Sequence, residues 1–268
     1  MVQKTKSTLF IGGGNMGAAI LTGFRDSGGD MNAVCVVDPF MDVDAGVQLG
    51  LKGLYRRIDE IPEEIVFDIM VLAIKPQIFD TFDAAWALKL AQDGMVISIM
   101  AGVGSDRIQT SAGRNCDIVR CMPNMAAAVG RSVNVAFATN PARKGDFQML
   151  FSGSGPVRWV NIEADIHLAT AVSGSGPAYF FAFVEALVLA GEKAGLESQF
   201  SLDLTIDTMI GATELLKENR TPSVLRESVT SKGGTTAAAL DAFAKNDVLQ
   251  TAVEDAVNAA AARSRALA

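Results

Sequence analysis

The sequence predicts an α/β domain with a mostly parallel sheet, followed by a domain made only of helices. In the first part of the chain, short apolar runs alternate with longer amphipathic segments, which is the pattern of strand–helix units. Most of the short runs are apolar throughout, as in strands covered on both faces. From about Ala164 the strand-like runs stop, and the segments become long, alanine-rich and helical in period. We therefore predict two domains, residues 1–162 and residues 163–268.

The elements of the first domain can be placed in chain order. Helical spacing of apolar residues marks Met16–Asp26 and Gln77–Leu90. The predicted strands are Thr8–Ile11, Ala33–Val37, Ile69–Ile74, Met95–Ile99, Ile118–Cys121, Val133–Phe137 and Val157–Val160.

The first long helix of the second domain is predicted to start at Ser175-Gly176-Pro177, with a capping serine and a proline in its first turn, and to end near Gly195. Its segment Tyr179–Leu187 is apolar on nearly every face, so the helix needs partners all round. A central core helix and a helix covered partly by a second subunit both satisfy this pattern. Two further apolar stripes follow, within Leu202–Leu216 and Val248–Ala262.

Composition and charge restrict the class of partner. The chain is 49% hydrophobic and 20% charged, which is ordinary for a globular protein. Its net charge is −7 and its pI is near 4.8. Nucleic acids and anionic membranes attract basic surfaces, so neither is expected as the main partner.

Cysteine usage and apolar run lengths indicate a reduced, cytoplasmic protein. Cys35, Cys116 and Cys121 lack the close pairs of zinc sites and redox dithiols, so we expect reduced, mostly buried thiols. The residues before Thr8 are polar and contain no apolar signal-peptide region. The longest apolar stretch, Ala178–Ala190, is shorter than the roughly 18 residues expected of a membrane-spanning helix.

A glycine-rich turn points to a cofactor. Gly12-Gly13-Gly14-Asn15-Met16-Gly17 leaves the first predicted strand and opens the first predicted helix, matching the G-x-G-x-x-G pattern of the Rossmann dinucleotide-binding fold. In that pattern the first glycine permits the tight turn, the second lets the pyrophosphate approach the backbone, and the third lets helix and strand pack closely. The helix N-terminus supplies amide donors to the phosphates. The alternative is a chance glycine-rich turn.

Asp38 ends the second predicted strand, where an acidic residue accepts hydrogen bonds from the adenosine ribose. Its carboxylate is expected to repel a 2′-phosphate, so we predict that NADH is used at least as well as NADPH. The alternative is an aspartate that only starts a turn before Pro39.

Further segments resemble blocks of the pyrroline-5-carboxylate reductases. These are Ala73–Gln77, Ile97–Val103, Val119–Asn124, Ser173–Tyr179 and Val229–Thr236. They are similar to that family in order and spacing along the whole chain, and the last two are the most specific. The resemblance implies reduction of 1-pyrroline-5-carboxylate to proline with NADH or NADPH, the last step of proline biosynthesis. It also implies a homodimer or larger homo-oligomer formed through the helical domain.

The resemblance implies the site residues as well. The cofactor would be bound by Gly12, Gly14, Asn15, Met16, Gly17, Asp38, Ala73, Ile74, Lys75, Pro76, Met100, Ala101 and Asn124. The substrate would be bound by Val229, Ser231, Gly233, Gly234, Thr235 and Thr236. One departure is Lys232, where the family usually has proline, which leaves the loop less rigid and adds a cation near the substrate.

Reducing a cyclic imine requires mainly that the substrate be positioned against the cofactor. The glycines of Gly233-Gly234-Thr235-Thr236 precede an alanine-rich helix, Ala237–Phe243, whose free amides can hold a carboxylate. By the resemblance, Thr236 would donate a hydrogen bond to the ring nitrogen. A plain helix cap is the alternative role for Ser231, Thr235 and Thr236.

Other residues carry weaker signals for catalysis, and other functions share part of this pattern. His167 stands outside every block, so a structural or surface role is expected, and the Lys75 backbone is a better candidate contact than its side chain. No metal-ligand cluster is evident in the sequence. The competing functions are a reductase of another cyclic imine or of a 3-hydroxy acid, and a non-catalytic dinucleotide-binding scaffold.

Overall fold

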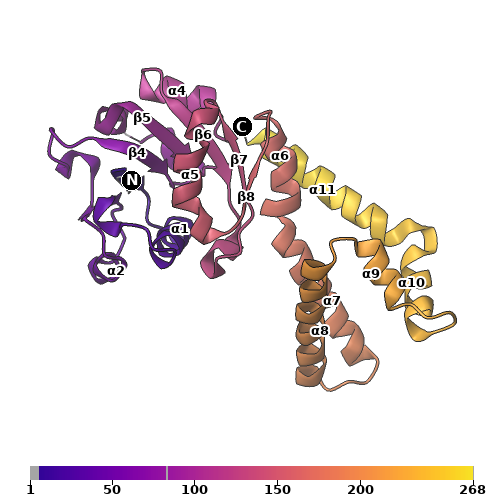
Figure 1. Cartoon of the computed structure of the whole chain (residues 1–268). Helices are drawn as coiled ribbons and strands as arrows, with labels where there is room; N and C mark the ends of the chain where they lie inside the picture. Colours follow the sequence, from indigo (N-terminus) through magenta and orange to yellow (C-terminus); the bar gives the residue numbers. More distant parts are fainter. Residues whose placement is uncertain (1–5, 83, 268) are drawn as a thin grey trace. The chain divides into compact units, whose positions relative to one another are not determined.

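The computed structural model of the protein describes residues 6–82 and 84–267. By compactness the chain divides into two units: the residues up to Ser175 together with those from Ala260 onward, and the residues Gly176–Ala259. The first unit contains a sheet with helices, and the second contains helices only (Figure 1). The predicted fold class is therefore confirmed. The predicted boundary after residue 162 stays a prediction, since only helices follow it among the described residues but the compact unit changes at Gly176.

One eight-stranded sheet forms the centre of the first unit, with the order β3-β2-β1-β4-β5-β6-β7-β8. All neighbouring strands are parallel except β6 and β7. The chain moves outward from β1 to β3 and then returns to β4 beside β1, so the strand order reverses between β1 and β4. Ligands of such sheets bind at this switch point, outside the carboxyl ends of the strands. The strands are β1 Thr8–Ile11, β2 Val34–Val37, β3 Gly53–Tyr55, β4 Phe67–Leu72, β5 Leu90–Ser98, β6 Asp117–Met122, β7 Asn134–Ala138 and β8 Val157–Trp159.

The core lies on both faces of this sheet. Phe10 belongs to one buried cluster, while its neighbours Leu9 and Ile11 belong to another, because successive side chains of a strand point to opposite faces. Both clusters are apolar, which explains why the strands are apolar throughout. The helices of this unit are α1 Asn15–Asp26, α2 Val43–Leu49, α3 Pro76–Phe79, α4 Ser105–Ala112 and α5 Lys144–Phe151.

One prediction about this unit was wrong, and one strand was missed. The segment Gln77–Leu90 is not one helix, because α3 ends at Phe79 and a separate 3-10 turn spans Ala84–Lys89. Thr81 donates its backbone N–H and its hydroxyl to the carbonyl of Ile78, a local arrangement that competes with helix continuation. The short strand β3 was not predicted, since three residues carry too little periodicity.

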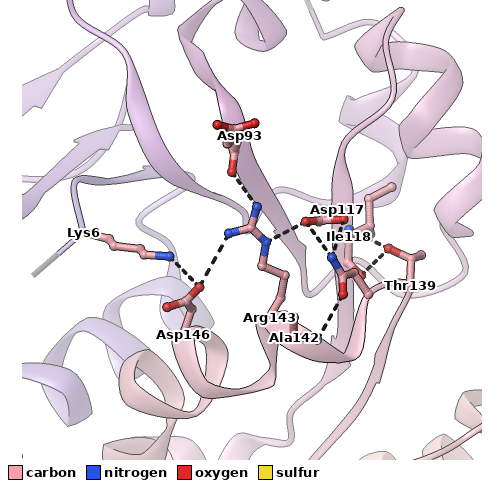
Figure 2. Close-up of polar contacts among 9 residues, drawn as sticks. Lys6, Asp93, Asp117, Ile118, Thr139, Ala142, Arg143 and Asp146 are labelled. Carbon is pink, nitrogen blue, oxygen red and sulfur yellow. Dashed lines mark hydrogen bonds and ion pairs between the residues drawn. The ribbon is translucent and has the colours of Figure 1, made fainter. Parts of the chain in front are cut away.

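Arg143 anchors the region around the antiparallel strand β7 (Figure 2). Its Nε donates to Asp117 Oδ2 at 2.6 Å and its Nη2 donates to the carbonyl of Asp93 at 2.6 Å. Asp146, one turn further along, also accepts a hydrogen bond from Lys6 at 2.7 Å. This network joins the start of α5 to the amino end of β6 and to Asp93 of β5.

The helices that follow are α6 Asp165–Ala169, α7 Gly176–Lys193, α8 Ser198–Glu218, α9 Pro222–Ser228, α10 Thr235–Ala244 and α11 Val248–Ala266. A π-helical turn, Thr170–Gly174, links α6 directly to α7. Ser175 therefore has helical φ and ψ and does not cap α7, contrary to prediction. The hydroxyls of Thr170 and Ser173 hydrogen-bond carbonyls four residues back, which carries the helical path through this segment. Gly195 has a φ of 108° just after α7, as expected of a residue that ends a helix.

The continuous helical run Asp165–Lys193 is long and apolar enough to cross a membrane, judged by length and composition. The prediction that its apolar stretch is too short was therefore wrong, because the mean hydropathy of the longer helix stays high despite its few polar residues. One such helix among the described residues is weak support for a membrane span, since an apolar helix of a soluble protein meets the same criterion.

Candidate functional site

Two adjoining hollows lie where the parallel strands end, and both belong to the first unit. They share Gly14, Ala73, Ile74 and Lys75. The larger, of about 670 Å³, extends past the ends of β1 and β2 to the residues after β3. The smaller, of about 370 Å³, extends past the ends of β5 and β6. Their position at the switch point is that of a dinucleotide in doubly wound folds.

The glycine-rich turn lies at the junction of the two hollows and fits a pyrophosphate. A Cβ on Gly12 would lie 2.5 Å from the carbonyl oxygen of Ala73, and Gly12 has a φ of 103°. A Cβ on Gly17 would lie 2.5 Å from the carbonyl oxygen of Gly12, so this glycine lets α1 approach β1. Gly14 has open space where a Cβ would be, and no side chain of the described residues caps the N-terminus of α1 that follows it. The amides of that first turn are therefore available to an anion.

Asp38 lies at the end of β2 within the larger hollow and is 9% exposed. Its Oδ2 accepts a hydrogen bond from the backbone N–H of Gly13 at 2.6 Å, and its Oδ1 accepts from Phe40 and Met41 at 2.7 and 3.0 Å. The carboxylate thus does form a turn around Pro39, and it also braces the glycine-rich loop. An ionised carboxylate has about four acceptor positions, so Asp38 retains capacity for a ribose hydroxyl.

The smaller hollow is mostly apolar. Met100 and Ala101 line it together with Ala73–Pro76, Asn15 and Met16, which brings together these predicted cofactor residues. Gly102, which follows, packs directly against the carbonyl oxygen of Leu267 near the chain's C-terminus. The wall behind Met100 and Ala101 is thereby supported by the last helix.

Two predicted cofactor residues lie outside both hollows. Gly17 acts through packing, as described above. Asn124 is 8% exposed, and its Nδ2 donates to the carbonyl of Ser173 at 2.9 Å while its Oδ1 accepts from the N–H of Ala126 at 3.1 Å. Asn124 therefore ties the segment after β6 to the π-helical turn.

The predicted substrate residues all lie in the second unit, from the residue after α9 to the first turn of α10. Gly234 is the N-cap of α10, and no side chain among the described residues caps this helix. The alternative that Ser231, Thr235 or Thr236 is a plain cap is therefore not what the structure contains. Gly233 has a φ of 71°, so the turn before the helix requires glycine there. Val229 ends α9 and is exposed.

His167 lies apart from both hollows. Its Nδ1 is 3.0 Å from the hydroxyl of Ser264, and burial, followed by the charges of Arg120 and Arg265, lowers its pKa. This agrees with the structural role expected for it. The cysteines are free, and no group of side chains suited to a metal ion occurs among the described residues.

Several residues that line the hollows were not predicted. They are Ile11, Val37, Pro39, Phe40, Arg56, Arg57, Ile58, Asp59, Ile78, Thr81 and Phe82 in the larger hollow, and Ile99, Met122 and Pro123 in the smaller. Met122 and Pro123 could have been found, because they follow a predicted strand in the same way as Lys75. Arg56 and Arg57 could not, because the strand before them was not predicted.

Comparison with known proteins agrees with this arrangement. Residues 163–267 match the family model described as pyrroline-5-carboxylate reductase dimerisation, and residues 8–102 match the model described as NADP oxidoreductase coenzyme F420-dependent. The helical domain is thus one through which this family forms homo-oligomers, and the first domain binds a nicotinamide dinucleotide.

Relatives of full length are also found. The pyrroline-5-carboxylate reductase of Pseudomonas aeruginosa is 34% identical, over 99% of this chain and 98% of its own. The solved structure of a pyrroline-5-carboxylate reductase from Coxiella burnetii has a TM-score of 0.90 at 32% identity and covers 99% of both chains. That of the Plasmodium falciparum pyrroline carboxylate reductase with NADP bound has a TM-score of 0.80 at 28% identity, again covering 99% of both chains. On the strength of this agreement over the whole length, the chain belongs to the pyrroline-5-carboxylate reductase family.

Proposed function

We propose that this protein reduces 1-pyrroline-5-carboxylate to proline with NADH or NADPH, as the last step of proline biosynthesis. The observation that carries the proposal is the glycine-rich turn of a dinucleotide site, with Gly14 open and α1 uncapped, in a chain that belongs to this family. When bound, the nicotinamide cofactor supplies the hydride. The protein's own task is to bind and orient both ligands.

The cofactor would be held by the first unit. The first-turn amides of α1 donate to the pyrophosphate, and Asp38 accepts from the adenosine ribose. The apolar lining around Met100 and Ala101 leaves the nicotinamide end dry, which favours hydride transfer over side reactions with water.

The substrate would be held by the residues from Val229 to Thr236. The uncapped amides at the start of α10 suit the substrate carboxylate, and Gly233 and Gly234 let a small ligand approach the main chain. Thr236 donates a hydrogen bond from its hydroxyl to the ring nitrogen near the reacting bond. Lys232 adds a cation within this segment, so the test includes the range of cyclic imines that the protein accepts.

The test is the oxidation of NADH and NADPH, followed by absorbance, with 1-pyrroline-5-carboxylate and a panel of other cyclic imines. We expect the Thr236→Val variant, which keeps the shape but loses the donor, to lower kcat on the order of a hundredfold. Thr213→Val is the matched control, because Thr213 is an exposed threonine on α8 that bonds only its own helix backbone. Unchanged kcat in Thr236→Val removes the donor role, and a preference for another imine or a 3-hydroxy acid changes the substrate.

The cofactor preference is a separate prediction. We expect NADH to be used at least as well as NADPH, since the Asp38 carboxylate faces the site of the 2′-phosphate. The ratio of kcat/KM for the two cofactors measures this. A value favouring NADPH by about tenfold, or about 1.4 kcal/mol, contradicts it.

We further propose a cytoplasmic homodimer, or a larger homo-oligomer built from it. Large apolar side chains are exposed along α7 and α8. This supports the proposal that helices of a second subunit cover them. Molecular mass measured by light scattering, with the protein purified without detergent, tests this arrangement.

A further inference from the structure

The adenosine end of the larger hollow carries charged groups of both signs. Asp38 and Asp59 supply carboxylates, and Arg56 and Arg57 supply guanidinium groups. Such groups matter there because an acidic residue at the end of the second strand recognises the ribose hydroxyl, whereas a nearby arginine accommodates a 2′-phosphate. The hydrogen-bond partners of each arginine therefore affect which cofactor is bound.

Arg56 is committed to the backbone. Its Nη1 donates to the carbonyls of Asp38 and Pro39 at 3.3 Å each and to that of Met41 at 2.5 Å. These contacts fix the turn that follows β2, so Arg56 serves as a brace for that turn.

Arg57 is instead paired with Asp59. Its Nε donates to Asp59 Oδ1 at 2.9 Å and its Nη2 donates to Oδ2, so one edge of the guanidinium faces the carboxylate. The hydrogen bond to Asp59 raises the pKa of Arg57, and the same bond lowers the pKa of Asp59. Both side chains are well exposed, at 73% and 57%. Exposed pairs are held only weakly, so a phosphate dianion can compete with Asp59 for Arg57.

We infer that the Arg57–Asp59 pair determines how strongly this protein binds the 2′-phosphate that distinguishes NADP from NAD. The inference rests on the proposed function. Asp59 neutralises Arg57, so this pair offers little net positive charge to the phosphate. NAD has a hydroxyl at that position, so its binding is insensitive to the pair.

The test measures equilibrium dissociation constants of NAD⁺ and NADP⁺ by calorimetry with the full-length protein. In Asp59→Asn, Arg57 is released, and we expect NADP⁺ to bind about threefold to tenfold more tightly, with NAD⁺ changed by less than about twofold. Arg57→Gln is expected to weaken NADP⁺ alone, and the gain from Asp59→Asn is expected to vanish in the double variant. Glu64→Gln and Arg158→Gln are matched controls, since both residues are exposed and neither lines the hollow.

The outcomes separate two failures. If the wild type binds NAD⁺ but Asp59→Asn shifts both cofactors equally, or no more than Glu64→Gln does, the role of the pair is refuted while the proposed function stands. If the gain persists without Arg57, the pair is likewise refuted. If the wild type binds neither cofactor, the proposed function fails and this inference fails with it.

Discussion

Three glycines of one turn serve three different purposes at the residue scale. Gly12 allows a positive φ and a close approach of the backbone to Ala73. Gly17 allows α1 to pack on that same turn. Gly14 is not required by the protein's own packing, because a Cβ there would meet nothing within 4 Å. We propose that its lack of a side chain serves the approach of a cofactor phosphate instead.

This difference gives a prediction that separates folding from binding. Gly14→Ala should leave the melting temperature nearly unchanged and abolish measurable NAD⁺ binding, because the new methyl group occupies space meant for the pyrophosphate. Gly17→Ala should lower the free energy of unfolding by about 1 to 3 kcal/mol, because its Cβ overpacks against the backbone. Thermal unfolding and calorimetry measure the two effects. A Gly14→Ala variant that binds NAD⁺ normally contradicts this account of the turn.

At this scale the sequence predicted the motif residues but not their neighbours. Gly12 and Gly14 were predicted from the glycine motif, and Lys75 and Met100 from the family resemblance; all four line the two hollows. Arg57 was missed because a three-residue strand precedes it. Asp38 was predicted as a site residue, but the hydrogen bonds that it accepts from Gly13, Phe40 and Met41 were not. These bonds depend on the path of the loop, which no residue pattern specifies.

At the scale of elements, Glu163 connects a helix, α4, to a strand of the sheet, β6, within the first unit. It follows the last strand and accepts hydrogen bonds from the backbone of Ser105, at 2.8 Å, and from its hydroxyl. It also pairs with Arg120 of β6 at 2.9 Å, and that arginine is buried. Burial alone raises the pKa of Glu163, but these hydrogen bonds and the ion pair outweigh it, so the pKa lies below the ordinary value of 4.5.

The lowered pKa gives a pH prediction. The folded state binds the Glu163 proton less readily than the unfolded state, so this group stabilises the fold above its unfolded pKa. That contribution is lost as the pH falls through the lower, folded pKa. Glu163→Gln should therefore cost about 1 to 3 kcal/mol of unfolding free energy at pH 7, and the difference from wild type should shrink below about pH 4.5. Urea titrations at several pH values measure it, with Glu64→Gln as an exposed control; a pH-independent difference contradicts the ion-pair account.

The sequence anticipated long elements better than short or joined ones. Strands β1 and β4 and helix α1 emerged from continuous periodic runs. The segment Gln77–Leu90 has helical spacing, yet the polar Thr81 closes a local turn within it. Ser175 looked like a cap because capping residues are identified by type, whereas the hydroxyl bonds that continue the helix through Thr170 and Ser173 depend on tertiary context.

At the scale of the whole molecule, the second unit leaves much apolar surface uncovered. Its helices α7 and α8 are apolar on more faces than they bury against each other. Large exposed side chains on these helices are Phe180, Phe181, Phe183, Leu187, Leu189, Phe200, Leu204, Ile206, Ile210, Leu215 and Leu216. So many large apolar side chains exposed on two neighbouring helices are typical of an interface. The sequence left open whether such a helix is a central core helix or the contact of a second subunit, and membership of the dimerisation family favours the latter.

Phe180 offers the sharpest test of that conclusion, because its side chain is 62% exposed in the single chain. If a second subunit covers it, Phe180→Glu places an unpaired charge in an apolar interface and should raise the dissociation constant of the oligomer by about thirtyfold or more. Val47→Glu is the matched control, since Val47 is 72% exposed on α2 of the first unit, where no partner helix is expected. Sedimentation velocity over a range of concentrations distinguishes the two variants. Equal oligomer stability in both would mean that Phe180 faces water, and the interface would then have to lie on another surface of the helical unit.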